Sequence, residues 1–518
     1  MGQQRSSASA GDSRVQAGGW RQSRGNDGHS SGLMQMTDSQ IASMNGKRAV
    51  ELHERSWWLD EALHYEKAHN ALPVLKGEVY ADVAIVGGGY TGLWTAVQLK
   101  IERPDLNVIV IEANICGAGA SGKNAGKVHG YWMSLSSLAS SLGKEDALEV
   151  ARLGSVAQQH ITDFVKASDV DVWWLEGGGL KVATTADHEA KLRKTAQTMI
   201  ELGSGSKAKL LSARQVSEHC SSPSFRNGIF YPEEATVHPA RLARAIRAHA
   251  LALGVKVFEN TPALLIKEGR RPQVTTPDGI ISADHVVLAT NVGLLKQPDV
   301  AAKVVAFSSY ALVTDPNEDI VGTSGWKSDC SLSDSRMFLH YSRKTADGRV
   351  LFGAGSGPIG YGSRVEAKSL SMDTDTVERV ERGFRHLFPH VTDMQPSRAW
   401  GGAIDVSSDR LPFARTKPGT NVHYACGFSG HGINPSYIMG RCLASLVLGK
   451  DNEWTRSAFC TRALPNLPPE PFRYLGGRMI RSSILACEDA DERDQKAPAI
   501  ARMMSRLPEL LNLRIGVR

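Results

Sequence analysis

Three glycines in the segment GGGYTG have a spacing that could bind the pyrophosphate of a dinucleotide. Gly87 can form a tight turn, Gly89 lets backbone N–H groups come close to a phosphate, and Gly92 lets a following helix pack closely against a strand. Tyr90 and Thr91 stand between the last two glycines, where that helix would begin. Because the free N–H groups of a helix N-terminus attract anions, this segment is a candidate phosphate-binding turn.

The residues around the glycines predict the elements that such a turn requires. The apolar run Val83–Val86 predicts a buried parallel strand before the turn, and Leu93–Lys100 has a helical pattern after it. A second apolar run, Val108–Ile111, ends on Glu112, which lies 20 residues beyond Gly92 and is placed to accept hydrogen bonds from a ribose of the cofactor's adenosine half. A glycine turn with a purely structural role is the alternative. The order strand, turn, helix, strand and acid favours a dinucleotide site.

A run of small residues, CGAGASGKNAGK at 116–127, follows the acid-ended strand. Small side chains allow a backbone to lie against a flat ligand, whereas a flexible surface loop would not need to stay so apolar. The segment GASGKNAG, after the GGGYTG turn and the acid-ended strand, resembles the D-amino-acid oxidase superfamily of FAD enzymes, and within it the γ-glutamylputrescine oxidase-like branch. The resemblance implies that FAD contacts Ser121, Gly122, Lys123, Asn124, Ala125 and Gly126.

The resemblance extends to later segments of the chain. Ala263 lies where relatives, most of which have Val, present their backbone to the adenine. Thr290 lies in an element that resembles the A-T-G segment near the cofactor phosphates, with Asn291 in place of the usual glycine. In HYACGFSGHGINP, a glycine loop leads into a helical pattern over 436–448. In the family, the N–H donors and dipole of that helix stabilise the pyrimidine edge of the reduced flavin. The residues implied there are Gly430, Gly432, Ile433 and Asn434.

Three residues are candidates for catalysis or substrate contact. His431, inside GFSGHG, would face the substrate in the family match, with a packed loop histidine as the alternative. Tyr341 and Arg343 have the two-residue spacing that puts side chains on one face of a strand. In relatives this sheet forms a wall over the flavin, and a surface-facing pair is the alternative. No general base is assigned and no metal site is predicted.

The predicted fold class is α/β, α+β overall, with a Rossmann-like FAD-binding domain and an interleaved antiparallel-sheet substrate domain. Residues 1–45 are rich in Gly, Ser, Gln and Arg, which predicts a disordered tail with no amphipathic transit-peptide pattern. Met34, Met36 or Met44 could equally be the true start. The expected order is tail 1–45, FAD-binding 46–170, substrate 171–234, FAD-binding 235–300, substrate 301–396, FAD-binding 397–450, and a C-terminal helical extension 451–518. The Arg-rich end, 501–518, is expected to be a solvated helix, with a membrane surface or a partner subunit as alternatives.

Composition limits the remaining function classes. A formal net charge of +6 with 22% charged residues is a mild basic bias, which does not argue for nucleic acid. The seven cysteines form no C-x-x-C pair, so reduced thiols in a cytoplasmic compartment are expected. No apolar run reaches the roughly 18 residues that a membrane span needs. We therefore expect a soluble protein without a membrane span.

The predicted reaction is implied by the resemblance. It is the oxidation of a C–N bond in an amine or amino acid, with hydride transfer to flavin and hydrolysis of the imine, and with oxygen or another electron acceptor completing the cycle. FAD is expected to be noncovalent, because some relatives attach it to a cysteine just after a W-x-G segment and residues 401–412 contain none. Two alternatives remain open. One is an NAD-dependent dehydrogenase that uses the same glycine turn. The other is a non-catalytic or electron-transferring flavoprotein subunit of a larger dehydrogenase.

Overall fold

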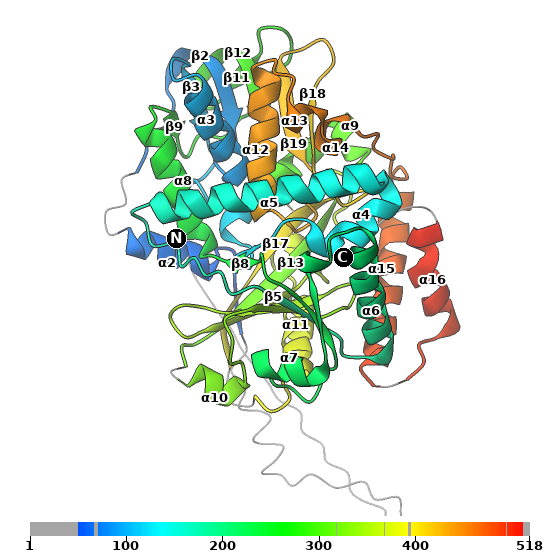
Figure 1. Ribbon diagram of the computed structural model, residues 1–518. Helices are drawn as coiled ribbons and strands as arrows, with labels where there is room; N and C mark the ends of the chain where they lie inside the picture. The colour runs from blue at the N-terminus through cyan, green and yellow to red at the C-terminus, as the bar shows by residue number, and fades with distance from the viewer. Residues whose placement is uncertain are drawn as a thin grey trace, which may run out of the picture. The chain divides into compact units, whose positions relative to one another are not determined.

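The glycine turn lies at the end of a strand in a sheet whose central strands are parallel (Figure 1). The computed structural model describes residues 50–66, 71–317, 319–366, 368–391, 395–493 and 495–510. The predicted tail at 1–45 falls outside these residues. The strands of this first sheet are β2 (Gly77–Val86), β3 (Val108–Ile111), β9 (Lys256–Phe258), β10 (Leu265–Lys267), β11 (Gln273–Thr275), β12 (Gly279–Leu288), β18 (Phe413–Thr416) and β19 (Val422–Cys426).

Both faces of the first sheet are buried at its centre, as the continuous apolar runs of β2 and β3 predict. In β2, Val83 and Ile85 pack into one hydrophobic cluster, whereas Ala84 and Val86 pack into another on the opposite face. β2 pairs in parallel with β12 on one side and with β3 on the other. This arrangement places the carboxyl ends of three strands at one edge, where ligands bind in open α/β sheets.

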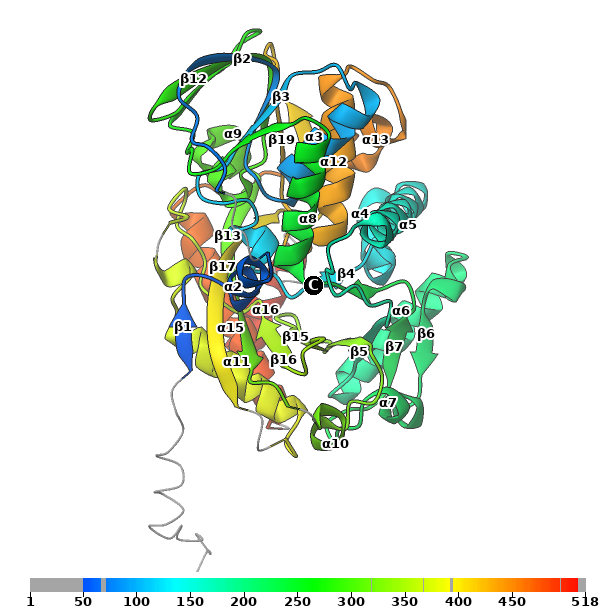
Figure 2. The same ribbon diagram turned by 90° about the vertical axis from the view of Figure 1, so that its left-hand side faces the viewer.

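A second, mainly antiparallel sheet contains nine strands among the described residues, in the order β1-β17-β13-β16-β15-β14-β5-β7-β6. Its strands are β1 (Glu51–His53), β5 (Gly179–Val182), β6 (Lys209–Leu211), β7 (Gly228–Tyr231), β13 (Val304–Thr314), β14 (Ser331–Ser333), β15 (His340–Lys344), β16 (Val350–Ala354) and β17 (Pro396–Ser407). A small ladder joins β4 (Lys127–Val128) to β8 (Ala235–Thr236). Figure 2 shows β13 and β17 side by side, as their pairing register requires.

The course of β17 differs from the predicted boundary at residue 397. The whole of 397–450 was predicted to belong to the FAD-binding part, yet β17 belongs to the nine-stranded sheet. The physical reason is its pairing with β13 from Val304↔Ser407 to Thr314↔Pro396. The chain therefore passes to the first sheet only after residue 407, at β18 and β19.

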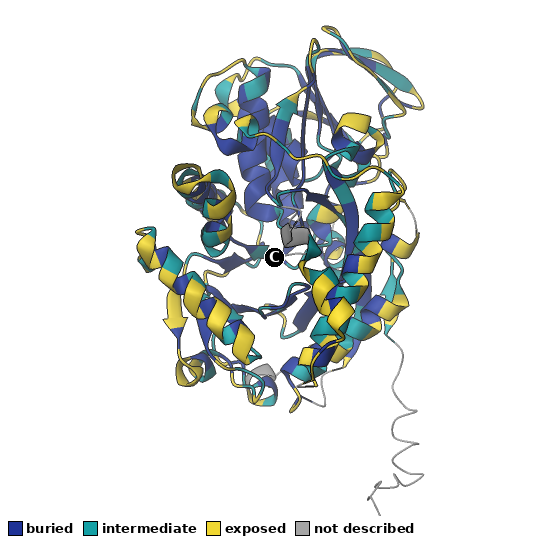
Figure 3. Cartoon of the chain, turned by 90° about the vertical axis from the view of Figure 1, so that its right-hand side faces the viewer, coloured by how far each residue is buried: buried dark blue, intermediate teal, exposed yellow. Residues whose placement is uncertain are grey.

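Fifteen helices flank the sheets in the described residues: α2 (Trp57–Tyr65), α3 (Tyr90–Glu102), α4 (Leu135–Leu142), α5 (Lys144–Ala167), α6 (Ala186–Glu201), α7 (Ala213–His219), α8 (Pro239–Ala252), α9 (Pro298–Ala301), α10 (Ile320–Ser324), α11 (Thr374–Leu387), α12 (Ile433–Val447), α13 (Glu453–Arg456), α14 (Ala458–Thr461), α15 (Phe472–Asp491) and α16 (Ala499–Leu510). None of the helices that the structure describes is long and apolar enough to cross a membrane. Figure 3 shows that buried residues concentrate in the central elements, whereas the outer helices are exposed along one side.

The two helices that follow glycine segments, α3 and α12, pack closely against each other. A side chain at Gly440 on α12 would place its Cβ 2.7 Å from the Cβ of Trp94 on α3, so only glycine permits this approach. The residues of both helices are almost entirely buried. This packing brings the N-terminal ends of α3 and α12, which are more than 300 residues apart in the sequence, close together.

Candidate cofactor and substrate site

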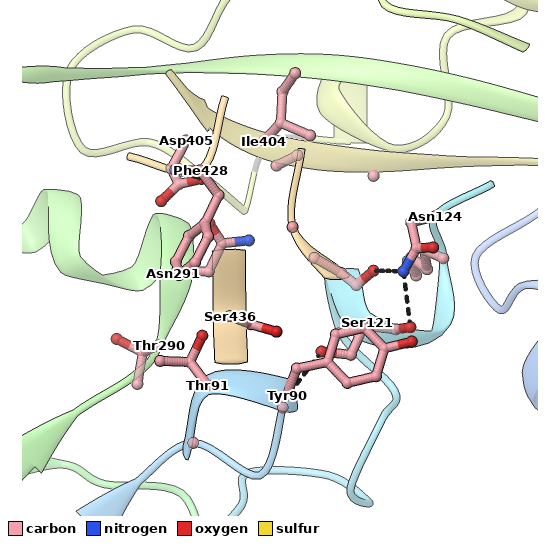
Figure 4. A pocket seen from close by; sticks show the side chains of 18 of the residues that line it. Tyr90, Thr91, Ser121, Asn124, Thr290, Asn291, Ile404, Asp405, Phe428 and Ser436 are labelled. Carbon is pink, nitrogen blue, oxygen red and sulfur yellow. Dashed lines mark hydrogen bonds between the residues drawn. The ribbon is translucent and has the colours of Figure 1, made fainter. Parts of the chain in front are cut away.

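One cavity of about 580 Å³ is lined by residues from both sheets and by the N-terminal turns of α3 and α12. Its volume falls in the range of roughly 300–1,000 Å³ that is typical of ligand sites. Figure 4 shows side chains from distant parts of the chain around this space, with Tyr90, Ser121 and Asn124 on one side and Asn291, Asp405 and Phe428 on another.

The glycine turn has the backbone geometry that its spacing predicts. Gly87 has φ +115°, a conformation that favours glycine, and its Cβ would lie 2.5 Å from the carbonyl oxygen of Ala289. A Cβ on Gly92 would lie 2.0 Å from the carbonyl oxygen of Gly87, so Gly92 lets the helix pack against the turn and does not itself line the cavity. Gly89 is the N-cap residue of α3 and lines the cavity without a side-chain cap.

Glu112 lines the cavity at the end of β3, and backbone donors fix its orientation. Its Oε2 accepts a hydrogen bond from the Gly88 N–H at 2.8 Å, and its Oε1 accepts one from the Asn114 N–H at 2.9 Å. Burial raises the pKa of the carboxyl group, while these N–H donors oppose the shift. Each carboxylate oxygen keeps a second lone pair, so the group can also accept from a ribose hydroxyl.

The small-residue loop folds over the start of α3 through its own side chains. The Ser121 Oγ accepts a hydrogen bond from the Tyr90 N–H at 2.9 Å. The Asn124 Nδ2 donates to the carbonyl oxygen of Ser121 at 2.9 Å, and its Oδ1 accepts from the Gly126 N–H at 2.8 Å. Lys123 lines the cavity, and burial lowers the pKa of its amine. These bonds hold the loop as a shaped wall.

Gly122 and Gly126 do not line the cavity, although the family resemblance implies that both contact FAD. A Cβ on Gly122 would lie 2.2 Å from the carbonyl oxygen of Gly117. Gly126 has φ +71°, and its Cβ would lie 2.1 Å from the carbonyl oxygen of Val237. Both glycines therefore allow the loop to pack closely, and they lie behind the residues that line the cavity.

Ala263, Thr290 and Asn291 line the cavity beside the first sheet. Asn291 has φ +50°, in the left-handed region that asparagine tolerates better than most residues, which explains how it replaces glycine in the A-T-G-like segment. Its Oδ1 is buried and has no hydrogen-bond partner among the described residues. A ligand that donates a hydrogen bond there would satisfy a buried acceptor.

The loop before α12 brings Gly430, His431, Gly432 and Ile433 to the cavity. Gly432 is the N-cap residue of α12 and provides no side-chain cap, so the helix presents backbone N–H groups and its positive dipole end to this space. Asn434, by contrast, is fully buried outside the lining.

Asn434 anchors α12 to α5. Its Nδ2 donates to the carbonyl oxygen of Gly154 at 2.8 Å and to the Oε1 of Gln158 at 3.0 Å. The predicted flavin contact through Asn434 is thus corrected for its side chain, because the amide is used to hold the two helices together.

Asp405, on β17, holds the glycine loop before α12 in place. It was not among the site residues predicted from the sequence. Its carboxylate accepts hydrogen bonds from the Gly427 N–H at 2.6 Å and the Phe428 N–H at 3.1 Å. Asp405 lines the cavity and is buried. Burial raises its pKa to about 7, although both N–H donors act in the opposite direction.

His431 lies in the cavity wall and is also packed, so both sequence interpretations describe part of its environment. Its ring stacks on that of His129 with a centroid distance of 3.9 Å and an interplanar angle of 10°. The His431 Nε2 donates to the carbonyl oxygen of His129 at 2.6 Å. His129 also lines the cavity and was not predicted, although it closely follows the small-residue loop.

Tyr341 and Arg343 share a strand, but only Tyr341 lines the cavity. The Tyr341 hydroxyl lies 3.2 Å from the Ser309 Oγ and donates to the carbonyl oxygen of Tyr310 at 3.2 Å. Burial raises the pKa of Tyr341 to about 12, so the hydroxyl keeps its proton at neutral pH.

Arg343 is buried beside the small-residue loop, which corrects the prediction that it contacts the substrate. Its Nη1 donates to the carbonyl oxygens of Gly126 at 3.1 Å and Val237 at 2.6 Å, and its Nε donates to that of Lys344 at 3.1 Å. Burial lowers its pKa to about 9. Main-chain carbonyls therefore accept from its Nη1 and Nε groups.

Comparison with known proteins identifies the family to which the chain belongs. A protein-family model described as FAD dependent oxidoreductase (DAO) matches residues 82–446. The chain belongs to this FAD-dependent oxidoreductase family. This assignment confirms the predicted family and cofactor.

The FAD-dependent oxidoreductase is similar to several known proteins. It is 29% identical over 414 residues to gamma-glutamylputrescine oxidoreductase of Escherichia coli (strain K12), covering 79% of this chain and 91% of the relative. It is 28% identical over 393 residues to the probable oxidoreductase OrdL of Rhizobium meliloti (strain 1021), covering 74% and 86%. The crystal structure of glycine oxidase from Geobacillus kaustophilus has a TM-score of 0.61 at 20% identity, covering 74% of this chain and 99% of that one. The mixed α/β fold is therefore as predicted.

The cavity fits FAD on its own chemistry. It offers a helix N-terminus for phosphate at Gly89, an oriented carboxylate for ribose at Glu112, and a second helix N-terminus at Gly432. The predicted residues that line it are Gly87, Gly89, Tyr90, Thr91, Glu112, Ser121, Lys123, Asn124, Ala125, Ala263, Thr290, Tyr341, Gly430, His431, Gly432 and Ile433. Lining residues that sequence analysis missed include Lys127, His129, Ser309, Ser333, Asp405 and Phe428.

Proposed function

We propose that this FAD-dependent oxidoreductase oxidises a C–N bond of an amine or amino acid to an imine, which then hydrolyses. One observation carries the proposal: the glycine turn, the N-terminus of α12 and the polar wall of the nine-stranded sheet line a single cavity. The names of two relatives, gamma-glutamylputrescine oxidoreductase and glycine oxidase, support a substrate of the amine or amino-acid class.

The protein's own groups would bind and orient the reactants. FAD, when bound, supplies the acceptor for a hydride from the carbon that bears the amine. The N–H groups at the start of α12 would stabilise negative charge in their neighbourhood, and Asp405 holds the loop that aims them. Tyr341 and His431 bring polar groups to the substrate side, where they would orient a neutral amine.

We further propose that FAD is bound noncovalently and that the enzyme works in a reducing, cytoplasmic environment. None of the seven cysteines lines the cavity, and all seven are free thiols. Reduced cysteines are usual in the cytoplasm.

Anaerobic mixing of the holoenzyme with a panel of amines and amino acids tests the function. We expect at least one substrate to bleach the flavin absorbance, and oxygen or another acceptor to restore it. If no member of the panel reduces a flavin that dithionite does reduce, the non-catalytic flavoprotein subunit becomes the better description.

A further inference from the structure

Helix α15 has apolar side chains on two faces, and one of these faces is exposed. Ile480 and Ile484 are buried in a cluster with residues of β13 and β17, so they hold the helix against the nine-stranded sheet. Phe472, Leu475 and Met479 have the spacing i, i+3 and i+7 of a different helix face, and they are 71%, 57% and 49% exposed. Figure 1 shows α15 outside the sheets, next to α16. The described chain therefore leaves three large apolar side chains of α15 in solvent.

Two tyrosines extend this exposed surface to a neighbouring loop. Tyr474 of α15 and Tyr361, which is 39% exposed, form an edge-to-face pair with ring centroids 5.1 Å apart. The guanidinium carbon of Arg478 lies 5.5 Å from the ring centroid of Tyr474, and that of Arg364 lies 5.5 Å from the ring centroid of Tyr361. The name α15 patch is used below for six exposed residues: Tyr361, Arg364, Phe472, Leu475, Arg478 and Met479.

The two segments that carry the α15 patch are basic. Residues 361–370 and 468–482 contain five Arg and Lys residues against two Glu residues, a net charge of +3. Each glutamate already pairs with a cation, Glu470 with Arg473 at 3.0 Å and Glu366 with Lys296 at 2.8 Å. Neither Arg364 nor Arg478 forms an ion pair within the described part of the chain. The patch therefore presents positive charge that these segments do not neutralise.

An anionic bilayer surface has the chemistry that the α15 patch lacks. Phe472 and Met479 are separated by roughly 10 Å along the helix axis, so the apolar face forms a stripe that can lie in the plane of a bilayer surface. Apolar side chains of such a helix enter the boundary between headgroups and acyl chains, whereas tyrosine and arginine stay at the level of the headgroups. Lipid phosphates can then pair with the two arginines.

A second copy of the chain fits this surface less well. A two-fold contact pairs a surface patch with itself, so Arg364 and Arg478 of one copy would face the same arginines of the other. Like charges placed together across a contact oppose association.

We propose that the α15 patch binds the surface of an anionic lipid bilayer, so that the enzyme associates peripherally with membranes. Phe472, Leu475 and Met479 enter the boundary between headgroups and acyl chains, and the arginines pair with lipid phosphates. None of the six patch residues lines the cavity, so the binding surface is separate from the proposed reaction site.

Flotation of the FAD-loaded enzyme with lipid vesicles tests the proposal without turnover. We expect binding to vesicles made of two parts phosphatidylcholine and one part phosphatidylglycerol, weaker binding to pure phosphatidylcholine, and weaker binding as the salt concentration rises. Leu475→Ser should weaken binding to the anionic vesicles about tenfold, because an apolar side chain no longer enters the lipid. Arg478→Ser should weaken it about fivefold, as expected for one cation near an anionic bilayer.

The matched controls are Leu265→Ser and Arg271→Ser, which should leave vesicle binding unchanged. Leu265 is 62% exposed on β10, and Arg271 is exposed just before β11, so both lie on the first sheet and outside the α15 patch. The double variant Phe472→Ser/Met479→Ser keeps the test decisive if Leu475→Ser folds poorly. FAD content and urea unfolding of each variant measure whether the fold is intact.

Absence of wild-type binding to the anionic vesicles would overturn the proposal. Binding that Leu475→Ser and the double variant both leave at the wild-type level would overturn it as well. Sedimentation velocity without lipid distinguishes the alternative occupant. A wild-type dimer that dissociates in Leu475→Ser, together with no vesicle binding, would make the α15 patch a contact between two copies of the chain.

Discussion

Asp405 offers a quantitative test of how the glycine loop before α12 is held. Its carboxylate is buried and accepts from the N–H groups of Gly427 and Phe428. Burial raises its pKa from an ordinary value of 3.8 to about 7. Since one pKa unit corresponds to about 1.4 kcal/mol, ionising this group in the folded protein costs on the order of 4 kcal/mol more than in the unfolded chain.

The raised pKa fixes the direction of the pH effect. The folded protein binds the proton of Asp405 more tightly than the unfolded chain does, so this contribution to stability is fully present below about pH 4 and is lost as the pH rises towards about 7. Asp405→Asn cannot ionise and should lack this dependence. Its amide can still accept from one loop N–H but not from both, a loss of about 1 kcal/mol at low pH. Between pH 5 and pH 8 the stability of the wild type relative to the variant should fall by roughly 3 kcal/mol.

Urea unfolding of both proteins at fixed FAD concentration, from pH 5 to pH 8, measures this difference. Asp451→Asn is a suitable control, because Arg456 lowers the pKa of this exposed group, which therefore stays ionised across this pH range and adds no pH dependence to it. Parallel stability profiles for the wild type and Asp405→Asn would refute the assignment of a raised pKa to Asp405.

Four further predictions concern the cofactor and the site. Glu112→Ala should lose FAD on gel filtration, because a charge-assisted bond to a ribose hydroxyl is worth about 1.5–3 kcal/mol; equal FAD retention would contradict that contact. Acid precipitation of the wild type should release all the flavin, and yellow colour in the pellet would show covalent attachment. Arg343→Ala should lower the midpoint of thermal unfolding, because the carbonyls of Gly126 and Val237 lose their donor at a cost in stability on the order of 2–3 kcal/mol. If the variant instead needs more substrate for half-maximal rate and has unchanged stability, Arg343 contacts the substrate after all. His431→Ala should slow flavin reduction at saturating substrate while FAD content stays normal, and unchanged stopped-flow traces would remove it from the site.

The parts of the site that the sequence predicts are those whose backbone conformation dictates residue type. Gly87 must be glycine because of its positive φ and the nearby carbonyl of Ala289. The glycine spacing in the sequence therefore predicts the turn. Strand β3 ends at Ile111, and Glu112 follows directly, as the apolar run and the acid predict. Long-range packing has no such local signature. Neither segment alone indicates that Gly440 lets α12 approach Trp94, although that contact unites the two halves of the cavity.

Polar residues beside a motif were harder to assign, because their type does not reveal which partner they satisfy. Asn434 and Arg343 both lie in or near segments that resemble the family, yet both donate to groups of the protein's own scaffold. A folded chain must pair its buried carbonyls, and long polar side chains often do this at the ends of loops. Ser333 is the reverse case: a short side chain in a strand without any motif, whose hydroxyl is buried at the cavity without a partner among the described residues. The hydrogen bonds that a side chain makes, and not its residue type, assign Arg343 to the loop.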